Sequence, residues 1–206
     1  MLKEDNTMID PITKYMLEGY IFTNKTISVN LSDFESRKNN KLIIVGVMGS
    51  GKSTIGKNLA KKYKVKWISI DSFWWRLKQK YFKDVEMNAK EMKNKLQDKF
   101  EDLVIKYLKS NERMIIEGIN LLEPKYRKLV LKHSMIILGI SSLKSGIRAA
   151  KRNRERENEG WKTYYWLIKL NMKKIEPYLK TLRKDAINIS NVKIEEYKVP
   201  KIRGII

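Results

Sequence analysis

The chain has 206 residues, of which 42% are hydrophobic and 33% are charged, which is enough apolar material for one packed domain. Its net charge is +21, from 44 basic and 23 acidic side chains, and a field of that sign attracts nucleotides, phosphorylated metabolites and nucleic acid. There is no cysteine and only one histidine, His133, so disulfides, thiolate metal sites, cysteine nucleophiles and histidine-cluster metal sites are excluded.

Residues 1–40 differ from the rest in charge, because they carry five basic and six acidic side chains while the remaining residues carry a net charge of +22. An Asp-Pro pair predicts a short helix over residues 10–18, and apolar residues predict a small hairpin over residues 20–31. We therefore expect residues 1–40 to form an N-terminal extension of a domain that spans residues 41–206. The first residues show no signal-peptide pattern, and the apolar runs are far shorter than the ~20 residues of a membrane helix, so we expect a cytoplasmic protein without a membrane segment.

From residue 41 onward, short β-branched runs alternate with longer helical stretches. The spacing of apolar residues predicts a long helix from about Asn88 to Leu108, and a second helix over residues 164–182 that Pro177 distorts. Strands that are apolar on both faces and separated by helices indicate a parallel sheet covered on both sides. We predict an α/β three-layer sandwich with a five-stranded parallel sheet, whose strands are Lys41–Val47, Val65–Ile70, Met114–Glu117, Ser134–Ile140 and Ala186–Ile189.

A phosphate-binding motif follows the first of these strands. The segment Gly46-Val47-Met48-Gly49-Ser50-Gly51-Lys52-Ser53 matches G-x-x-x-x-G-K-[ST] at every fixed position, and a helical pattern follows it. Glycines let consecutive N–H groups point inward at a phosphate, the helix adds its positive end, Lys52 supplies a cation and Ser53 offers a hydroxyl to Mg²⁺. We predict that ATP and Mg²⁺ bind here, with contacts from Gly46, Gly49, Ser50, Gly51, Lys52, Ser53 and Thr54.

Two acidic residues end predicted strands and are expected beside the phosphate loop, because ligands collect at the carboxyl ends of parallel strands. Asp71 directly follows the strand residues Trp67–Ile70, and Glu117 is the last residue of the predicted strand Met114–Glu117. Phosphoryl transfer to a hydroxyl needs a carboxylate that orients the acceptor and takes its proton, and an acidic group on the Mg²⁺ side. We assign Asp71 to the acceptor and Glu117, with Ser53, to the metal; the residues alone also allow the exchanged assignment.

An arginine-rich segment follows the fourth predicted strand. It contains Arg148, Lys151, Arg152, Arg154 and Arg156, and the four-residue spacing of Arg148 and Arg152 puts both on one face of a helix. Arginine suits phosphate oxygens, so we expect a lid at about residues 141–162 in which these two arginines neutralise charge during transfer. Glutamates alternate with Arg154 and Arg156 and favour a solvated helix face there.

The remaining candidates allow two interpretations each. An aromatic cluster after Asp71 is typical of an acceptor pocket on which a base or sugar stacks, and equally of core between helices; it comprises Phe73, Trp74, Trp75, Tyr81 and Phe82. His133 precedes a strand, and we interpret it as structural.

Four segments resemble the uridine kinase and phosphoribulokinase group of P-loop kinases, and together they span about residues 41–190. They are Gly46–Thr54, Ile68–Phe73, Ile115–Ile119, and Ile175–Pro177 leading to Ala186–Ile189. The arginine segment is similar to the lid of that group, and Met48–Gly56 also resembles the phosphate loop of shikimate and gluconate kinases. Neither the His-Pro segment of uridine kinases nor the glycine-rich segment of shikimate kinases has a counterpart, so the resemblance does not identify the acceptor.

The resemblance implies a five-stranded parallel sheet with the phosphate-loop strand at its centre, Mg-ATP as donor and a hydroxyl as acceptor. It implies that Asp71 orients the acceptor, that Glu117 is the second acidic residue, and that Arg148 and Arg152 belong to the lid. The expected function is an ATP-dependent kinase for a small nucleoside-, nucleotide- or sugar-like acceptor.

Two other functions remain open. The +22 body and the aromatic cluster would suit a kinase for the 5′-hydroxyl end of a polynucleotide, although an A/T-rich coding DNA would enrich lysine as well. A non-catalytic ATP-binding module, docking through residues 1–40, is the third. The sequence does not indicate an oligomeric state.

Overall fold

The computed structural model describes residues 25–81, 89–139, 145–149, 151, 166, 168–189 and 192–199. The helix expected over residues 10–18 and the first arm of the expected hairpin lie outside these ranges. So do Phe82, Arg152, Arg154 and Arg156.

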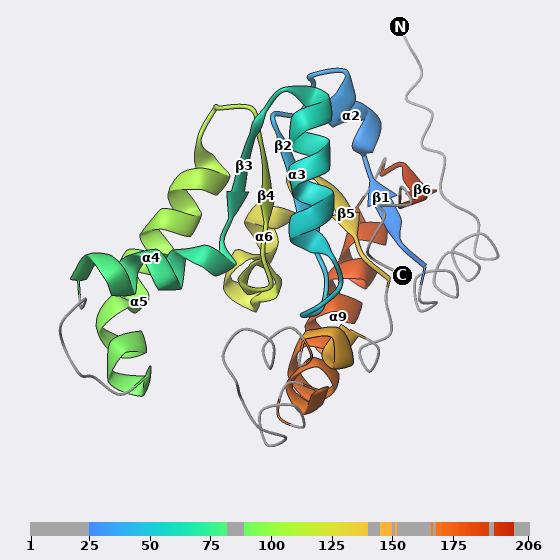
Figure 1. Cartoon of the computed structure of the whole chain (residues 1–206). Helices are drawn as coiled ribbons and strands as arrows, with labels where there is room; N and C mark the ends of the chain where they lie inside the picture. The colour runs from blue at the N-terminus through green and yellow to red at the C-terminus, as the bar shows by residue number, and fades with distance from the viewer. Residues whose placement is uncertain are drawn as a thin grey trace, which may run out of the picture.

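A mostly parallel sheet forms the centre of the described chain and confirms the expected α/β fold (Figure 1). Its order is β3-β4-β2-β5-β1-β6, and the four strands from β3 to β5 run parallel. β1 and β6 extend the sheet in antiparallel fashion beyond β5. The strand bounds are β1 Ile27–Val29, β2 Lys41–Val45, β3 Lys66–Ser69, β4 Met114–Glu117, β5 Ser134–Ile137 and β6 Ile194–Glu196.

Helices cover both faces of the sheet and complete three layers (Figure 1). The helices are α2 Leu31–Glu35, α3 Lys52–Tyr63, α4 Asp71–Tyr81, α5 Ala89–Lys109, α6 Arg127–Val130 and α9 Glu176–Ile187. Residues 145–149 and 168–170 are also helical, Asn171–Ile175 (η3) is a π-helical turn, and Asn120–Leu122 (η1) and Pro124–Tyr126 (η2) are 3₁₀ turns.

The alternation of side chains along β2 builds two cores. Leu42 and Ile44 pack with Phe34 of α2 and Ile55 of α3, whereas Ile43 and Val45 belong to the core formed with α4, α5 and α9. All five residues of β2 are buried. This burial on both faces is why Leu42–Val45 is an unbroken apolar run.

The expected fifth parallel strand, Ala186–Ile189, is wrong. Ile187 is the last residue of α9, and Leu179, Leu182 and Ala186 recur at steps of three and four on its buried face. Ala186 and Ile187 therefore continue the buried face of α9, because packing overrides the local strand preference of this segment. The helix is irregular at Asn171–Ile175, just before Pro177, whose ring crowds the carbonyl four residues earlier.

Only the second arm of the expected hairpin lies within the described residues. Ile27–Val29 is a strand that pairs with β5 along one edge and with β6 along the other. Leu31 opens α2 instead of continuing the strand. Arg183 of α9 secures this region, because the residue is 5% exposed and its Nη2 donates to the carbonyls of Lys25 (3.3 Å) and Ile137 (3.4 Å).

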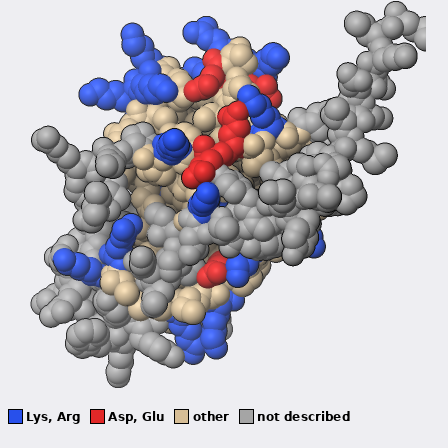
Figure 2. Space-filling view, turned by 90° about the vertical axis from the view of Figure 1, so that its right-hand side faces the viewer, with Lys and Arg blue, Asp and Glu red and all other residues tan. Residues whose placement is uncertain are grey.

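Among the residues that the structure describes, basic side chains do not form one continuous band on the face that Figure 2 shows. They stand at separate places, with acidic and uncharged side chains between them.

Candidate functional site

Strand register brings the site together. Ile44 of β2 pairs with Glu117 of β4, and Glu117 pairs with Ser69 of β3. The phosphate loop begins two residues after Ile44, and Asp71 lies two residues after Ser69. The three predicted site elements therefore share the carboxyl edge of the sheet, as the strand-end argument predicted.

The phosphate loop turns tightly between β2 and α3. Gly49 (φ 77°) and Gly51 (φ 92°) adopt left-handed backbone conformations that favour glycine, and Gly51 directly precedes α3. The Ser50 N–H donates to the Val47 carbonyl at 3.2 Å. A curled loop that leads into the positive end of a helix is suited to binding a phosphate.

Lys52 is the first residue of α3, and its side chain is 6% exposed. Its Nζ donates to the carbonyls of Gly46 (3.2 Å) and Val47 (3.1 Å). The ammonium group thus lies at the loop itself, where a phosphate chain would meet it.

Glu117 lies next to the Ser53 hydroxyl and is fully buried. The Ser53 hydroxyl donates to Glu117 Oε1 at 3.0 Å, while Oε2 is buried without a hydrogen-bond partner among the described residues. Burial raises the pKa of the Glu117 carboxyl, the charge of Asp71 raises this pKa further, and Lys52 and the hydroxyls of Ser69 and Ser53 oppose the shift. A buried carboxylate oxygen beside a serine hydroxyl is an oxygen donor set that fits Mg²⁺, which takes one or two carboxylates and completes its shell with phosphates and water.

Asp71 is exposed at the start of α4. Its Oδ1 accepts hydrogen bonds from the Ile119 N–H (2.8 Å) and from Asn120 Nδ2 (3.5 Å). Gly118 makes this approach possible, because a Cβ at that position would lie 2.9 Å from Asp71 Oδ1. Sequence reasoning missed Gly118 and Asn120, although a glycine directly after an acidic strand end was a visible signal.

The segment that carries Arg148 packs against the phosphate loop. Arg148 itself is exposed, and Ser145 at the start of the segment is buried. A side chain at Gly49 would overlap the Ser145 carbonyl oxygen, which lies 2.1 Å from the position of an added Cβ. The described part of the predicted lid therefore begins at the loop.

Sequence reasoning also missed a contact of Asn171. Asn171 is a polar residue in the apolar helical pattern of residues 164–182, and the structure buries it completely. Its side chain forms two hydrogen bonds with the main chain of Met48 in the phosphate loop. No local signal pairs residues that are 123 positions apart.

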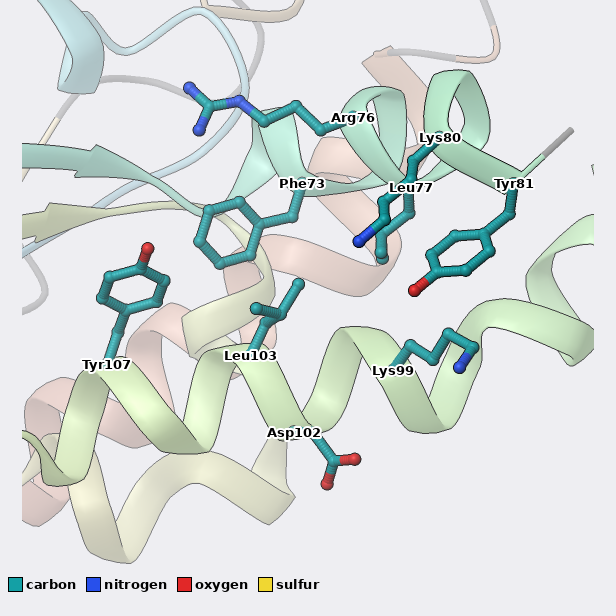
Figure 3. Close-up of a pocket in the computed structure, with 9 residues that line it drawn as sticks. All are labelled: Phe73, Arg76, Leu77, Lys80, Tyr81, Lys99, Asp102, Leu103 and Tyr107. Atoms are coloured by element: carbon teal, nitrogen blue, oxygen red, sulfur yellow. The ribbon is translucent and has the colours of Figure 1, made fainter. Parts of the chain in front are cut away.

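The aromatic cluster after Asp71 divides between core and cavity. Trp74 stacks on Phe100 with ring centroids 4.3 Å apart, and the side chain of Trp75 is outside the description. Phe73 and Tyr81 line a cavity of about 370 Å³ between α4 and α5, with Leu77, Leu103 and Tyr107 (Figure 3). Phe73 lies roughly 200° around the helix from Asp71, so this cavity and the Asp71 carboxylate belong to different sides of α4.

His133 lies at the opposite edge of the sheet, just before β5. It lines a cavity of about 590 Å³ together with Lys41 and Lys132. Burial, aided by the charge of Lys41, lowers the pKa of His133 to about 4, so the imidazole is neutral at pH 7. Its position is remote from the phosphate loop.

None of the helices described has the length and apolar character needed to cross a membrane. Across the same part of the chain, no group of three or more His, Asp or Glu side chains gathers at a metal-binding distance.

Comparison with known proteins found a matching family profile and a solved structure with a similar fold. The profile of the AAA domain family matches residues 42–162, which is more than half of the chain. The fold is similar to that of shikimate kinase from Acinetobacter baumannii, solved in complex with shikimate, with a TM-score of 0.53 and 15% sequence identity over 72% of this chain and 83% of that one. A search of curated proteins found no match.

Proposed function

The chain belongs to the AAA domain family, and from this premise we propose that it is an ATP-dependent kinase that transfers the γ-phosphoryl group of Mg-ATP to a hydroxyl of a small nucleoside-, nucleotide- or sugar-like acceptor. The observation that carries the proposal is the grouping of Lys52, the Ser53–Glu117 pair and Asp71 at one edge of the sheet. The resemblance to uridine kinases and the fold likeness to a shikimate kinase support a hydroxyl acceptor.

The donor side follows from the loop. Its amides and the positive end of α3 bind the phosphates, and Lys52 exchanges its two carbonyl partners for phosphate oxygens. Ser53 and Glu117 would hold Mg²⁺, which supplies positive charge that lowers the cost of charge development on the phosphates.

The acceptor side depends on Asp71. Its carboxylate is exposed to an incoming hydroxyl, yet the Ile119 N–H and Asn120 hold it in one orientation. In the proposed step the acceptor oxygen forms a bond to the γ-phosphorus of ATP. The bond between the γ-phosphorus and the oxygen that bridges it to the β-phosphorus breaks, so that ADP leaves, and Asp71 takes the hydroxyl proton. Arg148 and Arg152 are the proposed lid arginines that neutralise the transferred charge.

Lys52→Ala tests the mechanism. ADP release should be measured with Mg-ATP and a panel of nucleosides, nucleotides, sugars and shikimate-like alcohols. We expect the wild type to phosphorylate at least one class, Lys52→Ala to lose this turnover, and Lys61→Ala to keep it. Lys61 is the matched control because it is exposed at the far end of the same helix. A Lys52→Ala protein with near-normal turnover would refute the mechanism.

The two alternatives have their own tests. A polynucleotide 5′-hydroxyl kinase is favoured by the +21 charge and requires transfer to an oligonucleotide end rather than to mononucleosides. A non-catalytic module predicts ATP binding without transfer, and a partner that is lost when the N-terminal residues are deleted. That deletion should stop before Lys25, because removal of Ile27–Val29 would take a strand out of the sheet.

A further inference from the structure

Asn171 is a polar side chain in an apolar environment, and its carboxamide is completely buried. Its Oδ1 accepts the Met48 N–H at 3.0 Å, and its Nδ2 donates to the Met48 carbonyl at 3.1 Å. One side chain thus satisfies both main-chain groups of a single residue in the phosphate loop, as a neighbouring strand would. Burial of an amide is unfavourable unless its groups are bonded, so this pairing fixes the position of the side chain.

The helix that presents Asn171 is itself held firmly. Asn171 opens the π-helical turn that leads into α9, and Ile175 and Leu179 anchor the following residues in the larger core. A π-turn places side chains differently from a regular α-helix and is frequent at functional sites. Asn171 therefore reaches the loop from a part of the chain that packing keeps in place.

A second contact joins the same helix to the loop through residues 145–149. An added Cβ at Gly146 would lie 3.0 Å from Ile168 Cα, so these two backbones touch. On its other side this segment meets Gly49 at the Ser145 carbonyl. Residues 168–171 thus contact the phosphate loop in two ways. Asn171 bonds to Met48 directly, and Ile168 packs against residues 145–149, which in turn contact Gly49.

The loop needs such support, because its glycines give its backbone freedom. Gly49 and Gly51 populate conformations that other residues rarely adopt, and the Ser50–Val47 hydrogen bond within the loop is long at 3.2 Å. We infer that Asn171 is a positioning residue. By bonding to the main-chain N–H and carbonyl of Met48, it keeps the loop amides directed at the phosphates of the nucleotide. This inference rests on the proposed function in one respect, that the loop binds a triphosphate.

The test uses Asn171→Leu, which keeps the side-chain volume and removes both hydrogen bonds, and Leu182→Ala as the control. Leu182 is 2% exposed on the same helical stretch and belongs to the core, so its truncation weakens packing without touching the loop. Binding of Mg-ATP and of inorganic tripolyphosphate should be measured by calorimetry at a temperature where every variant is folded. Amide hydrogen exchange should be followed at Met48 and Gly49.

For Asn171→Leu we expect both ligands to bind about 10- to 100-fold more weakly, and the Met48 amide to exchange faster in the free protein. Leu182→Ala should lower the melting temperature and leave both affinities within about twofold. The inference is overturned if Asn171→Leu retains wild-type affinity and exchange, or if Leu182→Ala weakens binding as much. If the wild type bound neither ligand, the proposed function would fail, while the exchange of Met48 would still report whether Asn171 holds the loop.

Discussion

Glu117 is a carboxyl group whose environment opposes its charge. Because its pKa is raised in the folded protein, the folded state binds more protons than the unfolded state between the ordinary value and the raised one. Stability in the absence of nucleotide should therefore fall as the pH rises through that window. Glu117→Gln has no such charge, so it should melt at a higher temperature than the wild type at pH 7, and the difference should shrink towards pH 4.

Melting temperatures of both proteins between pH 4 and pH 8, without Mg²⁺ or nucleotide, check this expectation. Asp98→Asn is the control, since Asp98 is exposed on α5 and its substitution should change the melting temperature little. A Glu117→Gln protein that is less stable than the wild type at pH 7 would contradict the assignment of the raised pKa to burial. Mg-ATP should reverse the order, because the ionised carboxylate then has a cation to bind.

Gly118 matters because the Asp71 carboxylate lies against it. Gly118→Ala would place a Cβ 2.9 Å from Asp71 Oδ1 and 2.8 Å from Ile70 Cβ, so the carboxylate must move away from the Ile119 N–H. We expect kcat to fall about 10- to 100-fold, as a displaced catalytic group does, with little change in KM for ATP. Steady-state kinetics of Gly118→Ala, Asp71→Asn and the double variant test this. Effects that simply add would mean that Gly118 acts elsewhere.

For single residues, the sequence was informative where a local pattern indicated the chemistry, as in the phosphate-loop motif and in the acidic residues at strand ends. The spacing of Gly46, Lys52 and Ser53 predicted a loop that the structure places at the edge of the sheet. Asn171 could not be paired with Met48, because their contact depends on where a distant helix packs. Arg152 lies outside the described residues, so its place in the lid stays a prediction.

Among the elements, α9 is joined to the sheet by a buried charge. Arg183 donates to the carbonyls of Lys25 and Ile137, and burial lowers the pKa of its guanidinium to about 10, where it is still protonated at pH 7. Arg183→Ala would leave two carbonyls without this donor. We expect a loss of about 2–4 kcal/mol in the free energy of unfolding, measured by urea denaturation.

Lys184→Ala is the matched control for that variant, because Lys184 is the next residue and is exposed. It should change stability by less than about 0.5 kcal/mol. An equal loss in both variants would show that the effect does not arise from the hydrogen bonds of Arg183.

Periodicity predicted the elements that are long or flanked by clear breaks. The helix expected from Asn88 to Leu108 is α5, Ala89–Lys109. Four predicted strands are present, one with the predicted bounds Met114–Glu117 and three with shorter bounds. Ala186–Ile189 misled because a short apolar run is compatible with a strand and with the end of a helix. Ile27–Val29 was predicted as extended, but its partners could not be, because antiparallel neighbours from residues 134–137 and 194–196 are set by the tertiary fold.

For the whole molecule, the net charge of +21 raises the question of a nucleic-acid substrate. The described basic side chains on the face in Figure 2 stand at separate places, and such an arrangement attracts a polyanion without defining a path for it. A bound strand end would also have to reach Asp71, whereas the aromatic cavity between α4 and α5 lies on a different side of that helix. These features favour weak, salt-sensitive association over binding of a 5′ end.

We therefore expect a single-stranded oligonucleotide to bind at least about tenfold more weakly at 200 mM than at 50 mM KCl, whereas KM for a small acceptor should change by less than about twofold. Fluorescence anisotropy and ADP release, followed over the same salt series, measure the two quantities. A 5′-phosphorylated oligonucleotide of the same sequence is the control and should bind as well as its 5′-hydroxyl counterpart. Efficient phosphorylation of the 5′-hydroxyl strand at 200 mM KCl would instead make the polynucleotide end the acceptor, because non-specific charge attraction is largely lost at that ionic strength.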